Sequence, residues 1–439
     1  MNQSKCTLCI RKEDKNKWEK RAPVIPSHAK EFKQTHGINI CVQPSKIRIF
    51  KDSDYKKQGI ELINDLSQCS LILALKEIPI ELIMEARAYM FFTHTTKGQN
   101  QNMPMLKKFK QSRCTVIDYE KITDDEGRRL IFFGIQAGQS GMIETFHALG
   151  QRLSAQGLEN PFIDIKQPYQ YPNLKKAKEK IIQVGSFIKQ NGLSDELVPL
   201  VCGFCGYGHT SKGAQEIFDL LPHQEIPAKD LKGFMDTEDH SNNQVYKVVF
   251  KEKDMVEPID RTMKFELNDY YQNPHKYQSR FSQYLPYLTL IVNCIYWEPK
   301  YPRFVKNSDL RSVFSSHRNP RLKVIGDITC DIEGSVECTK FSTTPENPFF
   351  LFDPATEKIS RDPQGKGLAV MSIDNLPAEI ALESSLFFSK AIMPFLPKIA
   401  LADFTKDFDQ CHLPPPIKRA VILYNGEFTP EYKYMDKFI

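Results

Sequence analysis

The stretch of sequence that decides the fold is VPLVCGFCGYGHTSKGAQEIF, Val198 to Phe218. An apolar run leads into a turn that contains Gly206, Gly208 and Gly213, and a segment compatible with a helix follows. A small residue in such a turn lets the backbone approach a pyrophosphate, and the N–H groups at the helix start favour its negative charge. The spacing is GxGxxxxG and not the usual GxGxxG, so an ordinary glycine turn ahead of a buried helix stays open as the alternative.

On both sides of this turn, short β-rich runs alternate with helix-like segments. Strands are expected at Thr7–Ile10, Ile38–Val42, Leu71–Leu75, Ala88–Phe92, Cys114–Ile117, Val198–Phe204, Val245–Phe250, Leu288–Asn293, Lys323–Ile328 and Leu368–Ile373. Helices are expected at Ser27–Thr35, Met103–Lys110, Gly134–Leu153, Leu174–Gln190, around His275–Tyr284, and in the amphipathic Pro377–Leu396. This alternation predicts an α/β protein with two Rossmann-like, doubly wound domains and a cleft between them. We expect a substrate-binding domain in residues 1–140, completed by 377–439, and a dinucleotide-binding domain in 141–376.

The composition of the 439 residues, 41% hydrophobic and 26% charged, is that of an ordinary globular protein. No apolar run approaches the ~18 residues that span a bilayer, and the N-terminus shows neither a signal peptide nor a transit segment. We therefore expect a cytoplasmic chain with no membrane contact and with reduced thiols at its eleven cysteines. The CxxC pairs Cys6/Cys9 and Cys202/Cys205 lie in or beside apolar runs without a further pair at finger spacing, so we predict no metal site.

The positive charge is concentrated at one end of the chain. Residues 1–51 hold twelve Lys and Arg against four Asp and Glu, a local charge of +8 within a net charge of +5. No aromatic-basic platform or recognised binding module accompanies this excess, so we predict no nucleic-acid binding. A solvated basic face and a site for a small polyanion both stay open.

Polar residues follow several of the expected strands at the point where each strand ends. The carboxyl ends of parallel strands meet at one edge of a sheet, where ligands bind. The residues concerned are Arg11, Lys76, Glu77, His94, Asp118 and Glu120. Lys76 and His94 make a candidate acid–base pair, provided that burial or a second cation lowers the lysine pKa from ~10.4. A capping histidine and a surface salt bridge are the alternatives.

Arginines are the natural clamps for substrate carboxylates, because a planar guanidinium donates two parallel hydrogen bonds. The candidates are Arg21 in EKRAPVIP and Arg129 in DDEGRRLIFFG, with Arg11 and Arg128 in addition.

With these motifs in place, the chain resembles the lysine-ketoglutarate reductase domain of alpha-aminoadipic semialdehyde synthase and the lysine-forming saccharopine dehydrogenases. More distantly it is similar to alanine dehydrogenase and the transhydrogenase N-terminal domain. The matching stretches run from end to end: IRKEDKNKWEKRAP (Ile10–Pro23), VQPSKIRIF (Val42–Phe50), LALKEIP (Leu73–Pro79), YMFFTHTTKGQ (Tyr89–Gln99), IDYEKITDDEGRRL (Ile117–Leu130), KGAQEIFDLLP (Lys212–Pro222), NCIYWEPKYPR (Asn293–Arg303), GDITCDIEGSVE (Gly326–Glu337) and MSIDNLPAE (Met371–Glu379).

The resemblance implies an oxidoreductase that condenses L-lysine with 2-oxoglutarate and reduces the imine with NADPH to saccharopine, the first step of lysine degradation. It implies that Lys76 and His94 are the catalytic acid–base pair. It also implies that Arg21 and Arg129 bind substrate carboxylates and that Glu77 and Glu120 are acidic residues near the active site. Arg11 is a further substrate-binding candidate. The expected coenzyme-binding residues are Gly206, Tyr207, Gly208, His209, Thr210, Gly213, Asp331, Asp374 and Asn375.

The chain departs from this family at the glycine turn. GYGHTS stands where the family usually has GxGNVS, which places His209 and Thr210 at the helix start. NAD stays open beside NADP, because Glu225 and Asp230 could hold a ribose hydroxyl, whereas Lys229 and Lys232 could accept a 2′-phosphate.

The sequence leaves several further alternatives open. The chain ends about where bifunctional relatives begin the linker to a saccharopine-oxidising half, so we expect that second activity to be absent. Reductive amination of a small 2-oxo acid, as in alanine dehydrogenase, and a catalytically silent regulatory homologue are the competing functions. A mitochondrial location is the alternative to the cytoplasm, and homo-oligomerisation is open.

Overall fold

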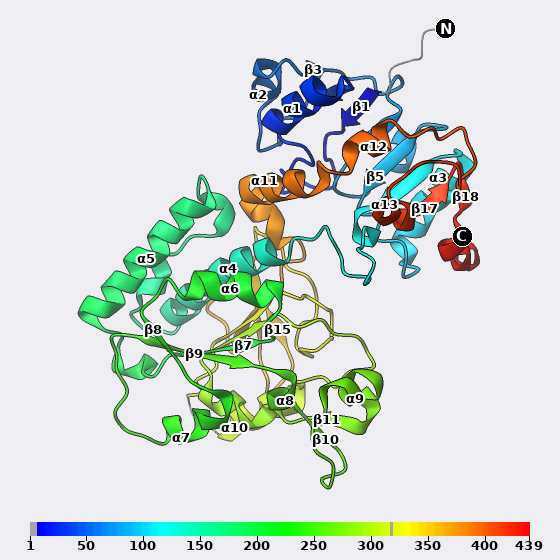
Figure 1. Cartoon of the computed structure of the whole chain (residues 1–439). Helices are drawn as coiled ribbons and strands as arrows, with labels where there is room; N and C mark the ends of the chain where they lie inside the picture. The colour runs from blue at the N-terminus through cyan, green and yellow to red at the C-terminus, as the bar shows by residue number, and fades with distance from the viewer. Residues whose placement is uncertain (1–6, 317–318) are drawn as a thin grey trace. The chain divides into compact units, whose positions relative to one another are not determined.

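The computed structural model describes residues 7–316 and 319–439, and the chain divides into two compact units (Figure 1). Unit 1 comprises residues 1–133 and 381–439, and unit 2 comprises residues 134–380. Each unit is built on one eight-stranded, mostly parallel sheet, so the predicted α/β class is confirmed. The expected boundary at residue 140 falls inside helix α4 (Gly134–Ala155), which lies wholly in unit 2 because the helix is continuous. The cleft between the domains stays a prediction.

The sheet of unit 1 has the strand order β18-β17-β6-β5-β4-β1-β2-β3. The parallel strands are β1 (Thr7–Ile10), β2 (Asn39–Val42), β3 (Glu61–Leu62), β4 (Leu71–Leu73), β5 (Ala88–Phe91) and β6 (Thr115–Asp118). The tail adds the antiparallel strands β17 (Val421–Tyr424) and β18 (Glu427–Phe428). The helices are α1 (Pro26–His36), α2 (Asp52–Lys57), α3 (Met103–Gln111), α11 (Ala381–Ile392), α12 (Leu396–Ala400) and α13 (Pro415–Ala420).

The sheet of unit 2 has the order β15-β14-β16-β13-β12-β7-β9-β8. Its parallel strands are β7 (Val201–Cys205), β8 (His223–Glu225), β9 (Val245–Phe250), β12 (Leu290–Asn293), β13 (Val324–Asp327) and β16 (Leu368–Met371), and β14 (Phe349–Phe352) and β15 (Ile359–Ser360) are antiparallel. Beside α4, the helices are α5 (Leu174–Asn191), α6 (His209–Phe218), α7 (Leu231–Met235), α8 (Glu252–Met255), α9 (Leu267–Gln272) and α10 (Asn307–Ser316). A separate pair joins β10 (Val256–Pro258) to β11 (Tyr277–Ser279).

Helices cover both faces of the unit 2 sheet, with α4, α5 and α6 on one face and α7 and α10 on the other (Figure 1). Strand β7 serves both cores, because alternate side chains point to opposite faces. Phe204 packs in the α4 and α6 core, whereas Val201 packs in the α7 and α10 core. The helices α4 and α6 pack closely: a Cβ on Gly138 would lie 1.9 Å from Thr210 O, and one on Gly213 would lie 2.1 Å from Ile135 O.

The prediction of a helix around His275–Tyr284 is wrong. Residues Tyr277–Ser279 form β11, which pairs antiparallel with β10 between short 3₁₀ turns. Pro274 starts the first of these turns, and the ring of Tyr277 packs with Val256 and Tyr270 in a small satellite core. Tertiary packing of an aromatic side chain therefore decides the local structure here.

Within the described ranges, no helix is long and apolar enough to cross a membrane.

Candidate active site

Four neighbouring parallel strands of unit 1 deliver the predicted site residues to one edge of the sheet. The strands β6, β5, β4 and β1 lie side by side and end at Asp118, Phe91, Leu73 and Ile10. Glu120, His94, Lys76 and Arg11 follow these ends in the chain. The alternating pattern of the sequence therefore places all four at the edge where α/β sheets bind ligands.

His94 is held by an ion-pair network centred on Glu77. His94 Nδ1 lies 2.7 Å from Glu77 Oε1, and Lys15 Nζ lies 2.9 Å from Glu77 Oε2. Burial favours a higher pKa for Glu77, but the hydrogen bond from His94 and the charges of His94 and Lys15 prevail and hold that pKa far below its ordinary value. His94 itself has φ +48°, and its carbonyl accepts a hydrogen bond from Asn102 Nδ2 at 3.0 Å. A left-handed backbone at a non-glycine residue is sparsely populated and clusters at functional sites.

Lys76 is half-buried, and its main chain is fixed by a buried acid. Its N–H donates to Glu13 Oε2 at 3.0 Å, and the N–H of Leu75 donates to Glu13 Oε1 at 2.7 Å. Burial and then the nearby Arg21 charge lower the pKa of the Lys76 ammonium. Among the residues that the structure describes, that ammonium makes no hydrogen bond or ion pair. A lysine with these properties is suited to proton transfer.

Each predicted arginine clamp already faces a carboxylate of the chain. Arg21 donates to both oxygens of Glu19, at 2.8 and 2.6 Å, and is 3% exposed. Its guanidinium also lies 4.5 Å from the ring centroid of Phe133. Arg129 Nη2 lies 2.8 Å from Glu120 Oε1.

Of the two additional arginine candidates, Arg11 pairs with Asp14 and is 3% exposed. Arg128 pairs with Asp124 and Glu126 at the surface. Of the two arginines predicted first, Arg129, which is half-exposed in its ion pair with Glu120, is therefore more accessible to an incoming carboxylate than Arg21.

Two buried acids, Glu13 and Asp118, have raised pKa values that the sequence does not reveal. Burial raises the pKa of Glu13 to about 7 and that of Asp118 to about 6. Asp118 Oδ2 accepts a hydrogen bond from Thr93 Oγ1 at 2.6 Å, one residue before His94. No local motif reveals Glu13, because its partners lie far along the chain at the end of β4.

We expect Glu13 to make unit 1 less stable as the pH rises. An acid whose pKa is raised in the folded state ionises more readily in the unfolded chain. The stability that protonated Glu13 contributes is therefore fully present below about pH 4.5 and is lost as the pH rises through 7. For this fully buried group the loss is about 3 kcal/mol. Urea unfolding of Glu13→Gln between pH 5 and 8 should show a flatter pH dependence than the parent chain, and an equal slope would contradict the expectation. Glu427→Gln, at an exposed position of the same sheet, is the control.

A hollow of mixed charge opens at the ends of β1 and β2. Its volume is about 620 Å³, and its charged lining residues are Lys12, Lys17 and Lys46 together with Glu13, Asp14 and Asp52. The lysines are balanced by acids here, so this hollow does not favour a polyanion over the solvated basic face.

In unit 2, the glycine turn lines a pocket of about 530 Å³. Gly206 has φ +95°, and its N–H donates to Phe250 O at 3.0 Å. Gly208 is the N-cap of α6 without a side-chain cap, and a Cβ there would meet nothing within 4 Å. Open backbone N–H groups at a helix start are suited to a pyrophosphate, so the turn fits a dinucleotide. Tyr207, His209 and Thr210 also line this pocket.

The strand order places other residues beside the glycine turn than those that the chain order suggests for the ribose site. The second strand after the turn, β9, pairs with β7, and β8 pairs outside it at the sheet edge. Glu225 is the last residue of β8 and Asp230 follows that strand, and neither lines the pocket. Lys251 and Glu252 follow β9: Lys251 Nζ lies 5.7 Å from the ring centroid of Tyr207, and Glu252 lines the pocket. Glu252 Oε1 accepts a hydrogen bond from Tyr271 Oη at 2.7 Å.

The remaining predicted coenzyme residues lie outside this pocket. Asp331 follows β13, and Asp374 and Asn375 follow β16, at the carboxyl edge of the sheet that also bears the glycine turn. Gly213 packs against the backbone of α4, so the absence of a side chain there lets the helices α6 and α4 approach closely. Four tyrosines that the sequence analysis did not single out line the pocket, at positions Tyr270, Tyr271, Tyr296 and Tyr301.

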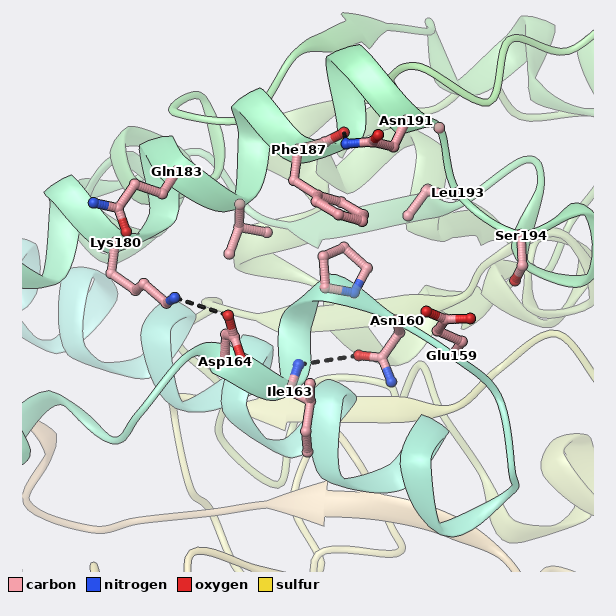
Figure 2. A pocket seen from close by; sticks show the side chains of 13 residues that line it. Glu159, Asn160, Ile163, Asp164, Lys180, Gln183, Phe187, Asn191, Leu193 and Ser194 are labelled. Atoms are coloured by element: carbon pink, nitrogen blue, oxygen red, sulfur yellow. Dashed lines mark hydrogen bonds and ion pairs between the residues drawn. The ribbon is translucent and has the colours of Figure 1, made fainter.

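A second hollow in unit 2, of about 550 Å³, lies between α5 and the turn after α4 (Figure 2). The ring of Phe187 and the side chain of Leu193 border it, and Lys180 forms an ion pair with Asp164 at its rim. Leu193 and Ser194 precede β7, so this hollow lies near the edge where the strands begin. It therefore belongs to neither predicted site.

Residues 9–140 match the family described as alanine dehydrogenase/PNT, N-terminal domain. Alpha-aminoadipic semialdehyde synthase of Arabidopsis thaliana is 40% identical over 96% of this chain. The resemblance inferred from the motifs is confirmed. The mitochondrial enzyme of that name from Bos taurus is 34% identical over 99% of the chain, and the chain spans 40% and 48% of these two relatives. Saccharopine dehydrogenase [NAD(+), L-lysine-forming] of Emericella nidulans is 29% identical, over 86% of this chain and 88% of the relative.

Two solved structures share the fold of the chain. L-alanine dehydrogenase superimposes with a TM-score of 0.63 at 12% identity, over 99% of this chain and 100% of that one. Transhydrogenase from Sinorhizobium meliloti gives a TM-score of 0.51 at 11% identity, over 96% of this chain and 100% of that one. At these identities the likeness concerns the fold alone.

Proposed function

We propose that the chain is a lysine-ketoglutarate reductase, a saccharopine dehydrogenase of the L-lysine-forming type. It would join L-lysine to 2-oxoglutarate and reduce the imine to saccharopine with NADPH, as the first step of lysine degradation. The observation that carries the proposal is the gathering of Lys76, the His94–Glu77 pair and the arginines at one edge of the unit 1 sheet. Relatives that align with most of the chain carry names from this chemistry.

The substrates bring three carboxylates, and unit 1 offers cations for them. Arg129 would exchange its contact with Glu120 for a substrate carboxylate, since its side chain is 45% exposed. The local charge of +8 in residues 1–51 adds long-range attraction. Arg21, locked to Glu19, would act by its charge on Lys76 rather than as a clamp.

Lys76 and His94 would divide the proton transfers between them. Attack on the ketone requires a neutral ε-amine, and Lys76, with its lowered pKa, would accept the proton from the substrate ammonium. Loss of water from the carbinolamine requires an acid. His94, whose Nδ1 faces Glu77, would give that proton from Nε2. The dihydronicotinamide, when bound, supplies the hydride.

The glycine turn and its tyrosine-lined pocket are the proposed site of the coenzyme. The N–H groups at the start of α6 would hold the pyrophosphate. We favour NADPH because Lys251 brings a cation beside Tyr207, whereas one oxygen of Glu252 is already engaged by Tyr271. A 2′-phosphate prefers such a cation.

The test is oxidation of NADPH with lysine plus 2-oxoglutarate, with each substrate omitted in turn and with NADH in parallel. We expect activity only with both substrates, and faster with NADPH. Activity with pyruvate and ammonia but none with lysine would select an alanine dehydrogenase-like function. If a fluorescence titration shows no NADPH binding at millimolar concentration, the protein is a silent homologue.

A further inference from the structure

Three cysteine side chains lie together inside the sheet of unit 1, apart from the residues assigned above. Cys9 is on β1, Cys41 is on β2, and Cys69 lies just before β4. Cys9 and Cys41 are register partners in parallel strands, so their side chains leave the same face of the sheet. The three Sγ atoms lie within 4.8 Å of one another, and each residue is at most 3% exposed. All three are free thiols.

The spacing of these sulfur atoms matches that of thiolates on a shared metal ion. A Zn–S bond is about 2.3 Å, so two thiolates on one tetrahedral ion lie about 3.8 Å apart. Cys41 Sγ and Cys69 Sγ lie 3.8 Å apart. Cys9 completes a triangle whose sides are all below 4.8 Å, so small side-chain rotations would bring three donors onto one ion.

We propose that Cys9, Cys41 and Cys69 form a binding site for one thiophilic cation of the Zn²⁺ class. Thiolates are soft ligands and select such ions over magnesium or calcium. Three thiolates and a divalent ion leave one negative charge in the sheet. Arg87 Nη2 donates to Ser67 O at 2.7 Å, two residues before Cys69, which places a guanidinium charge in this part of unit 1.

Glu61 on β3 is the register partner of Cys41, so Cys9, Cys41 and Glu61 form one row across three strands. The carboxylate of Glu61 lies outside the group of donors within 4.8 Å of one another, so the three thiolates alone define the site. Metal held there would stabilise unit 1, because binding free energy to a folded site is folding free energy.

The prediction of no metal site rests on closely spaced cysteines only, whereas Cys9, Cys41 and Cys69 are far apart in the chain. In β7, Cys202 and Cys205 pack in different cores on opposite faces of the sheet, so they cannot share an ion. Cys6 of the other CxxC pair lies outside the described residues. The three thiols are brought together by parallel strand pairing, and not by a short spacing in the chain.

The test uses the full chain, reduced and stripped of metal under anaerobic conditions, and titrated with Co²⁺. We expect a thiolate-to-cobalt charge-transfer band that saturates at one ion per chain and disappears when Zn²⁺ is added. Cys41→Ser and Cys69→Ser should each weaken binding more than about 100-fold, since loss of an outer partner alone costs 10–100-fold. Cys114→Ser, which removes another buried thiol of unit 1, should leave the titration unchanged.

Zn²⁺ should also raise the unfolding midpoint of the parent chain and of Cys114→Ser. Absence of a charge-transfer band, or a band that survives in Cys41→Ser and Cys69→Ser, would overturn the proposal. If those variants fail to fold, alkylation of the parent chain decides: Zn²⁺ must protect Cys9, Cys41 and Cys69 in partly unfolding urea, and equal labelling with and without Zn²⁺ overturns the site.

Discussion

Lys76→Met should lower the turnover of saccharopine formation by ~10²–10⁴, the range for loss of a positioned acid–base group. The side chain keeps its length and apolar stem but cannot accept a proton from the substrate ammonium. The affinity for NADPH should change little, because the pocket at the glycine turn is lined by residues of unit 2. Steady-state kinetics and a fluorescence titration on the same preparations measure both effects.

Two further variants sharpen this expectation. Lys76→Arg keeps the positive charge but cannot lose its proton near neutral pH, so it should be about as slow as Lys76→Met. Lys57→Met, at a side chain on α2 that is 75% exposed, is the matched control and should retain full turnover. Full activity of Lys76→Arg would mean that residue 76 supplies only charge, and full activity of Lys76→Met would remove it from the mechanism.

Gly208→Val should weaken NADPH binding by about 100-fold or more. The Cβ at this position enters open space, so the fold has room for it, but the isopropyl group would cover the N–H groups at the start of α6. Loss of even one or two charge-assisted hydrogen bonds, each about 1.5–3 kcal/mol, gives a change of this size. Quenching or enhancement of fluorescence in an NADPH titration measures it without any dependence on turnover.

Gly233→Val is the control for this variant. A Cβ at Gly233, on α7, also meets nothing within 4 Å, and the residue does not line the pocket. Its NADPH affinity and unfolding midpoint should stay near those of the parent chain. NADPH affinity that is unchanged in Gly208→Val would mean that the pyrophosphate does not bind at the glycine turn.

Much of the fold follows from local sequence patterns. The strands β1 and β9 begin and end where the apolar runs predict, and the other parallel strands except β3 and β8 lie within a few residues of the prediction. The strands that the sequence did not predict are two to four residues long and lie at or near the sheet edges, such as β8, β15 and β18. So short a segment carries too little periodicity to identify, and it becomes a strand only because a neighbour pairs with it.

The residues of the candidate site also fall into two groups: those that the local sequence reveals and those that only strand pairing brings to the site. Lys76, Glu77 and His94 are recognisable because each follows an apolar run. The partners Glu13 and Lys15 are not, because they follow β1 and meet Lys76 and Glu77 only through the adjacency of β1 and β4. The same holds at the predicted ribose position: chain order points to residues at and after the end of β8, whereas β9 lies next to β7.

By itself, the sequence of this protein determined which segments are strands and helices, which strand ends carry charged side chains, and which family the motifs resemble, because hydrophobic periodicity and turn chemistry are local properties. Only the tertiary structure decided which strands are neighbours. It thereby decided which acid holds the backbone of Lys76, which residues adjoin the glycine turn, and that three distant cysteines meet, because these contacts depend on strand order and register and not on separation along the chain.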